Sequence, residues 1–127
     1  MYASRESLRV LIADDEPLIA NTLAQIVNLS GFQAKAVYSG EDAVTHAREL
    51  KPDVLITDVV MSGITGIEAA IQILETLPAC KIILFSGQAA TLNLLKEARA
   101  DGYGFEILPK PVNPQTLIDL LKIPALS

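Results

Sequence analysis

The sequence predicts an α/β domain in which a doubly wound, five-stranded parallel sheet is covered by five helices. Two observations predict it. Short apolar runs alternate with longer segments of helical period along the chain, and strict strand–helix alternation requires right-handed crossovers between parallel strands. Three of the apolar runs are almost uninterrupted, which is typical of strands buried on both faces of a sheet.

The five short apolar runs are the predicted strands. They cover residues 8–13, 34–37, 53–57, 81–85 and 105–108. The first predicted helix follows the first run, with apolar residues from Ile19 to Val27 at helical spacing. Pro17 suits its first turn, where no backbone N–H is needed, and Gly31 suits its end.

The other four helices are predicted over residues 40–50, 66–77, 89–100 and 113–123. In the first of these, Ala43 and Ala47 lie on one side. The next two end at Pro78 and Gly102. Asn113 is a good capping residue for the last one, because its side chain can accept from free backbone N–H groups.

Size and composition limit the kind of protein. The chain has 127 residues, enough for one domain, and residues 1–7 are expected to form a flexible tail. A net charge of −5 and a pI near 4.7 argue against nucleic acid as a direct ligand. No segment is long and apolar enough to span a membrane, so membrane contact is not expected. Cys80 is the only cysteine, which excludes an internal disulfide, indicates a structural thiol and favours a cytoplasmic location.

Chemically capable side chains follow four of the five predicted strands. The first strand ends in Asp14, Asp15 and Glu16, the third in Asp58, the fourth in Ser86 and the fifth in Lys110. In an open parallel sheet, ligands bind in the crevice beyond the carboxyl ends of the strands. These side chains are therefore expected to meet at one edge of the sheet.

Gathered acids need a cation, because carboxylates a few ångströms apart repel one another. Mg²⁺ suits oxygen ligands, and the absence of an accompanying His or Cys argues against zinc. Asp14, Asp15 and Asp58 carry three negative charges, which Mg²⁺ and Lys110 would balance. A phosphoryl group could then enter by displacing metal-bound water, with the Ser86 hydroxyl as a donor to it.

Each of these residues also has a simpler interpretation when taken alone. Asp14 and Glu16 could be helix-capping acids, Ser86 a turn residue and Lys110 a surface lysine. The prolines on either side of Lys110 argue against a freely exposed side chain, since each restricts the backbone. His46 lies within a predicted helix and is interpreted as solvated.

The sequence resembles the receiver domain of bacterial two-component response regulators, of the stand-alone type. Four motifs carry the resemblance, which runs from Leu8 to about Leu121. They are "LIADDEP", "DVLITDVVMSGITG", "ILFSG" and "PKP". The resemblance implies a flavodoxin-like sheet of strand order 2-1-3-4-5, with residues 8–123 as the receiver domain. Residues 124–127 would be the C-terminal end, with no output domain after it.

The resemblance also implies a role for each residue of the set. Asp58 would accept a phosphoryl group from a sensor histidine kinase or a phosphotransfer protein. Asp14, Asp15, Asp58 and the backbone carbonyl of Val60 would hold Mg²⁺. Lys110 would pair with the phosphoryl group, and its bond to Pro111 would be cis.

The same resemblance implies how a signal would leave the site. Ser86 would move toward the phosphoryl group and pass the signal to the face of the fourth helix, the fifth strand and the fifth helix. A downstream protein would bind there, and a homodimer is left open. The protein would be no enzyme beyond catalysing its own phosphorylation and dephosphorylation.

Three positions depart from the receiver pattern. Ser62 stands where proline is typical, so a more mobile loop is expected there. Ile107 stands where an aromatic residue is usual, and Phe105 or Tyr103 could substitute for it. Val60 is apolar and cannot orient an attacking water, which predicts a long phosphate lifetime.

Two alternative functions use parts of the same set of residues. A pseudo-receiver that works without phosphorylation would lack one of the required acids, and all are present here. A phosphatase of the haloacid dehalogenase type would carry a second Asp two positions after Asp58, where Val60 stands.

Overall fold

The computed structural model describes residues 8–87, 96–97, 99 and 102–122. The strands are β1 (Arg9–Ala13), β2 (Gln33–Val37), β3 (Val54–Asp58), β4 (Lys81–Ser86) and β5 (Glu106–Pro109). The helices are α1 (Pro17–Leu29), α2 (Gly40–Leu50), α3 (Gly66–Thr76) and α5 (Pro114–Lys122). The predicted helix at 89–100 lies largely outside the described residues, as do the predicted tail (1–7) and C-terminal end (124–127).

The five strands form one parallel sheet in the order β2-β1-β3-β4-β5, which confirms the predicted fold class and strand order. The central strands β1, β3 and β4 are buried along almost their whole length. Their uninterrupted apolar sequences are explained by this position, because both faces of each strand are covered.

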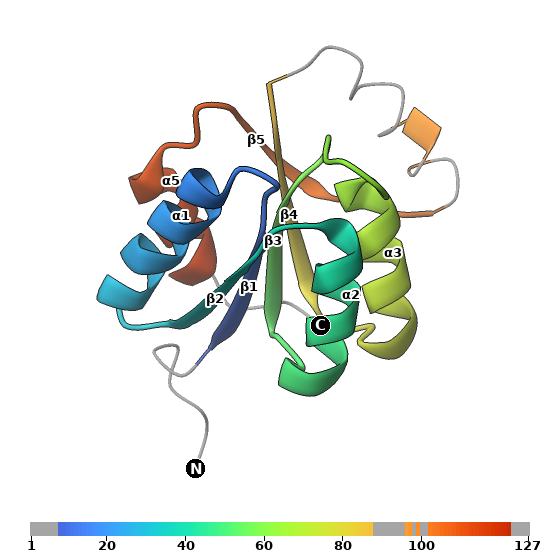
Figure 1. Ribbon diagram of the computed structural model, residues 1–127, viewed down its shortest axis with the longest axis horizontal. Coiled ribbons are helices and arrows are strands. Elements are labelled where there is room, and N and C mark those ends of the chain that lie inside the picture. The colour runs from blue at the N-terminus through green and yellow to red at the C-terminus, as the bar shows by residue number, and fades with distance from the viewer. Residues whose placement is uncertain (1–7, 88–95, 98, 100–101, 123–127) are drawn as a thin grey trace.

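Among the described helices, α1 and α5 lie on one face of the sheet and α2 and α3 on the other (Figure 1). One core lies between the sheet and the pair α1 and α5, and contains Ile12, Val27 and Leu117. The other lies between the sheet and the pair α2 and α3, and contains Leu11 and Ile73. Alternate residues of β1 therefore enter opposite cores, as the two-residue period of a strand requires.

The predicted boundaries differ from the structure by one residue in several places. Strand β3 runs one residue further than predicted, because Asp58 pairs with Phe85 of β4. Strand β5 likewise extends to Pro109, which pairs with Ser86. The backbone N–H of Lys110 points at β4, to the Ser86 oxygen. The nitrogen of Pro109 therefore faces away from the sheet, where an edge strand tolerates proline.

The buried thiol of Cys80 has the structural role predicted for it. Desolvation, together with the charge of Asp53, raises its pKa to about 12. Such a thiol is not nucleophilic at neutral pH. Among the described residues, no helix has the length and apolar character needed to cross a membrane.

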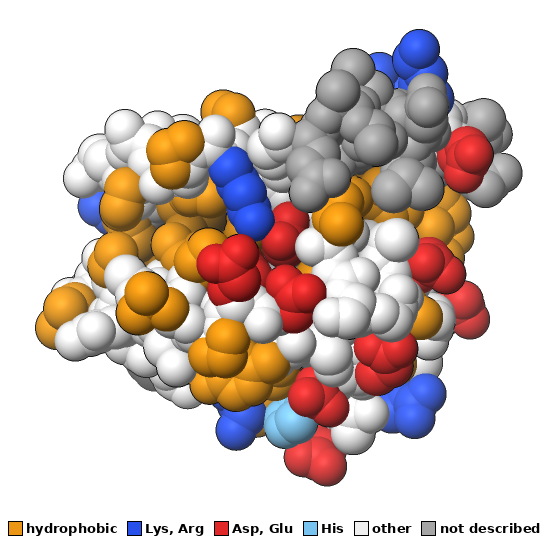
Figure 2. All heavy atoms as spheres, turned by 45° about the horizontal axis from the view of Figure 1, so that its top comes forward, with side chains coloured by type: hydrophobic (Ala, Val, Ile, Leu, Met, Phe, Trp, Pro, Cys, Tyr) orange, Lys and Arg blue, Asp and Glu red, His pale blue; other side chains and the backbone are white. Residues whose placement is uncertain are grey.

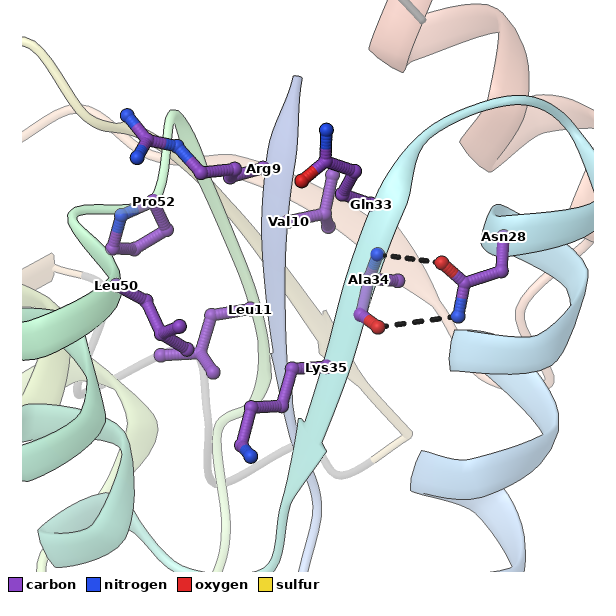
Figure 3. Close-up of a pocket in the computed structure, with 9 residues that line it drawn as sticks. All are labelled: Arg9, Val10, Leu11, Asn28, Gln33, Ala34, Lys35, Leu50 and Pro52. Carbon is purple, nitrogen blue, oxygen red and sulfur yellow. Dashed lines mark hydrogen bonds between the residues drawn. The ribbon is translucent and has the colours of Figure 1, made fainter. Parts of the chain in front are cut away.

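The side chain of Asn28 covers part of the open edge of β2. Its Oδ1 accepts from the Ala34 N–H at 2.8 Å and its Nδ2 donates to the Ala34 oxygen at 3.1 Å (Figure 3). Because β2 is the edge strand and, among the described strands, pairs with β1 alone, Ala34 would otherwise present these two groups to any strand that approached the edge. Asn28 thus takes the place of a neighbouring strand at one residue.

Replacing Asn28 with alanine is expected to lower the free energy of unfolding by about 1 kcal/mol, since two solvent-exposed hydrogen bonds are lost. Urea unfolding followed by circular dichroism would measure it as a lower midpoint with an unchanged slope. Asn28→Asp is the matched control, because it keeps the acceptor and loses only the donor, and its midpoint should fall in between. Identical midpoints for all three chains would contradict the role given to Asn28.

Candidate functional site

The side chains predicted to meet do lie at one edge of the sheet. Asp58 and Ser86 are the last residues of β3 and β4, the acids at 14 and 15 follow β1, and Lys110 follows β5. One carboxylate oxygen from each of Asp14, Asp15 and Asp58 lies within 4.8 Å of the others. Figure 2 shows acidic side chains gathered beside a basic one on this face of the molecule.

Asp58 is held by a tightly packed backbone. It is 6% exposed, and its carbonyl oxygen accepts from the Thr57 hydroxyl at 2.9 Å. The loop that follows is pinned on both sides, because the Val59 N–H donates to the Phe85 oxygen at 3.2 Å and the Val59 oxygen accepts from the Gly66 N–H at 2.8 Å. These hydrogen bonds therefore fix the backbone from which the Asp58 carboxylate extends.

Gly66 leaves room for that arrangement. A β-carbon at this position would collide with the Asp58 carbonyl oxygen and lie 3.0 Å from the Thr57 Oγ1. The first turn of α3 consequently packs directly against the end of β3. A glycine is required here by close approach of two backbones.

Lys110 is the cation of the site. Its Nζ donates to Asp58 Oδ2 at 2.9 Å and lies 3.8 Å from Asp14 Oδ2. Its Nζ also lies 5.3 Å from the centre of the Phe85 ring, and the bond to Pro111 is cis, as predicted. Desolvation disfavours the charged amine, but the hydrogen bond and charge of Asp58, with the charge of Asp14, outweigh it and raise the pKa of Lys110.

Gly87 makes room for the lysine stem. A β-carbon there would lie 3.3 Å from the Lys110 Cβ, so its lack of a side chain shapes the wall beside Lys110. Ser86 contributes its carbonyl oxygen to the Lys110 N–H at 3.1 Å.

Asp14 is completely buried, and only one of its two carboxylate oxygens accepts a hydrogen bond. Its Oδ1 accepts from the Glu16 N–H at 2.8 Å, whereas its Oδ2 has no hydrogen-bond partner. Burial, the largest cause, and the charges of Asp58 and Asp15 raise the pKa of Asp14, against the opposing effects of the Glu16 N–H and Lys110. The capping interpretation therefore accounts for one oxygen of Asp14 and leaves the other pointing into the site.

Glu16 does occupy the N-cap position of α1, but its side chain makes no capping hydrogen bond. The first turn of α1 is stabilised instead by Pro17 at its start, which has no N–H to satisfy.

These residues fit a divalent cation with oxygen ligands. The Asp14 Oδ2 accepts no hydrogen bond from the described protein and has only the 3.8 Å ion pair with Lys110, so it is open to a further ligand. The cluster contains carboxylates without His or Cys. Hard oxygen donors of this kind suit Mg²⁺.

Residues 10–122 match the family model of the response regulator receiver domain. The chain belongs to that family. It is 32% identical to the uncharacterized transcriptional regulatory protein YxjL of Bacillus subtilis, over 96% of this chain and 56% of that protein. It is 31% identical to the chemotaxis protein CheY of Thermotoga maritima, over 89% of this chain and 93% of that protein.

The solved structure of the chemotaxis protein CheY4 of Vibrio cholerae superposes on this receiver domain with a TM-score of 0.81. It is 25% identical and covers 91% of this chain and 97% of CheY4. Against YxjL and the DNA-binding regulator MtrA of Mycolicibacterium smegmatis, the receiver domain spans about half the length of the relative (56% and 47%). The sequence resemblance to two-component receivers is thereby confirmed.

Two hydrogen bonds from Ser62 were missed by sequence reasoning. Its N–H and its hydroxyl both donate to Asp15 Oδ2, each at 3.1 Å. These bonds tether the loop to Asp15 at a position where proline would stiffen the backbone, and the expected mobility of the loop stays a prediction. The departure from the family pattern was the only signal in the sequence.

Ile107 lies on β5 opposite Leu84 and is 38% exposed. Tyr103 and Phe105 stack on each other with ring centres 5.9 Å apart, and both pack against the core beneath α2 and α3. Aromatic side chains are thus present next to the receiver position that lacks one.

Proposed function

We propose that this receiver domain accepts a phosphoryl group on Asp58 from the phosphohistidine of a histidine kinase or phosphotransfer protein. The observation that carries the proposal is the 2.9 Å contact between Lys110 Nζ and Asp58 Oδ2, in a site where the buried Asp14 Oδ2 has no hydrogen-bond partner. An Asp58 oxygen attacks phosphorus, the bond from phosphorus to the donor imidazole breaks, and the imidazole nitrogen keeps the electron pair. The product is an aspartyl phosphate.

Asp14, Asp15, Asp58 and the Val60 backbone carbonyl would hold Mg²⁺, which neutralises charge on the transferring phosphoryl oxygens when bound. Lys110 supplies a fixed positive charge beside the same oxygens. Because phosphoryl transfer has a loose transition state, positioning and charge balance are the main work of these residues.

Ser86 is proposed to donate its hydroxyl to the new phosphoryl group. Ser86 lies at the end of β4, pairs with Pro109 of β5 and accepts from the N–H of Lys110, the residue after β5, which supports this role. Movement there would alter the face formed by β5 and α5, and so the binding of a downstream protein or a second copy of the chain.

The two alternatives are less well supported. A pseudo-receiver would lack an acceptor or a metal acid, yet the acid cluster of this site is complete. A haloacid dehalogenase-type phosphatase needs a general acid two positions after the nucleophile, where apolar Val60 stands.

The test is incubation of the chain with Mg²⁺ and acetyl phosphate, followed by intact mass measurement. One phosphoryl group should be added to the unaltered chain and none to Asp58→Asn, which retains the shape of the acceptor without its nucleophilic carboxylate. Asp119→Asn, an exposed acid on α5, is the matched control and should be labelled normally. Labelling of Asp58→Asn, or no labelling of the unaltered chain while a known receiver is labelled, would refute the proposal.

A further inference from the structure

Ser62 links two loops that meet at the acidic cluster. Both of its donors, the N–H and the hydroxyl, reach the same oxygen of Asp15 at 3.1 Å, although the two residues are 47 positions apart. Proline at this position could make neither bond, because it has no N–H and no hydroxyl. The N–H bond needs any residue other than proline, and the second bond needs the hydroxyl that serine supplies.

The donor side of this contact is anchored by its own neighbours. The Ile64 N–H donates to Glu41 Oε2 on α2 at 3.2 Å. The next residue, Thr65, forms a capping box with Glu68 at the start of α3. The loop that carries Ser62 is thus fixed by α2 and by α3, so Ser62 presents its donors from a fixed position.

The acceptor, the Asp15 carboxylate, is the group whose orientation must be fixed. Asp15 is exposed and lies beside two other carboxylates, those of Asp14 and Asp58. Mutual repulsion favours rotation of the exposed carboxylate out into water. Two hydrogen bonds to Oδ2 oppose that rotation, and within the described residues no hydrogen bond ends on Oδ1, which stays available for a cation.

We infer that Ser62 is a positioning residue for the metal site: it holds Asp15 in place to bind Mg²⁺ through Oδ1. The inference rests on the proposed function, in which Asp15 is a metal ligand. Hydrogen bonds to the ligating carboxylates are known to set metal affinity, and their loss typically costs one to two orders of magnitude. Here a residue outside the acid cluster makes that contribution, through its backbone N–H and its hydroxyl.

The test is the dissociation constant for Mg²⁺, measured by titration calorimetry on the whole chain. Ser62→Ala keeps the N–H and should weaken binding about threefold, whereas Ser62→Pro loses both donors and should weaken it about tenfold. Ser62→Thr keeps both donors and should bind nearly as the unaltered chain does. Ser30→Ala, which removes a hydroxyl bonded to the Ile26 oxygen at the end of α1, is the matched control and should leave the constant unchanged.

A second measurement detects the Ser62–Asp15 hydrogen bonds in the absence of metal. Amide exchange at Ser62 should be slow in the metal-free chain and faster in Asp15→Ala, because the acceptor is gone. Equal Mg²⁺ constants for the unaltered chain, Ser62→Ala and Ser62→Pro would overturn the inference and leave the proposed function standing. An unaltered chain that binds no Mg²⁺ would overturn both.

Discussion

Replacing Asp14 with asparagine should make the metal-free protein more stable, by about 1–3 kcal/mol near neutral pH, and abolish its stabilisation by Mg²⁺. The Asp14 Oδ2 is buried with no hydrogen-bond partner, next to the carboxylates of Asp58 and Asp15, and only a 3.8 Å ion pair with Lys110 Nζ offsets its charge among the described residues. An amide there carries no charge and can donate to a neighbouring carboxylate, while its oxygen still accepts from the Glu16 N–H. The buried Asp14 carboxylate thus lowers the stability of the metal-free protein but provides an oxygen ligand for the metal.

The gain from Asp14→Asn should depend on pH. Burial, followed by the charges of Asp58 and Asp15, raises the pKa of Asp14 above its ordinary value of 3.8. A carboxyl whose pKa is raised on folding contributes stability fully below its unfolded pKa and loses that contribution as the pH rises through its folded pKa. The advantage of the variant should therefore grow as the pH rises from about 4 and level off above the folded pKa of Asp14.

Urea unfolding of both chains in EDTA, at several pH values, measures this difference. Asp15→Asn is the matched control: this acid is exposed, so its replacement should change the free energy of unfolding by less than about 0.5 kcal/mol. If Asp14→Asn were less stable than the unaltered chain without metal, the ion pair with Lys110 would outweigh the cost of burying the Asp14 charge, and this account of Asp14 would be wrong.

Replacing Gly66 with alanine should cost about 3 kcal/mol of stability and slow labelling by acetyl phosphate about tenfold. The new β-carbon would collide with the Asp58 carbonyl oxygen and lie 3.0 Å from the carbonyl carbon. Both atoms belong to a central strand that cannot move freely, so the first turn of α3 must retreat. Asp58 would lose the support that sets its position.

Chemical unfolding and the rate of mass gain measure the two effects separately. Gly104→Ala is the control, since a β-carbon there meets no atom within 4 Å, and it should be neutral in both assays. A fully stable and rapidly labelled Gly66→Ala chain would show that α3 and β3 are not packed as described.

Much of the fold followed from the sequence because its causes are local. The helical period of residues 40–50 predicted α2 with the bounds that it has, and Asn113 caps α5 through the N–H groups of Gln115 and Thr116. The site was predictable for a related reason. A parallel sheet brings the carboxyl ends of its strands to one edge, so Asp58 and Lys110 had to come close whatever the details of their loops.

The sequence by itself thus determined the strand–helix alternation, the sheet edge that carries the chemistry, and the residue types gathered there. Only the tertiary structure decided that one oxygen of Asp14 accepts no hydrogen bond, that Gly66 contacts Asp58, and that Ser62 donates to Asp15. Periodicity and capping are set by neighbouring residues along the chain. These contacts instead depend on the relative positions of loops that are far apart in the sequence. An increase of about one ångström in the distance between donor and acceptor is enough to lose a hydrogen bond, and no sequence pattern specifies distances that closely.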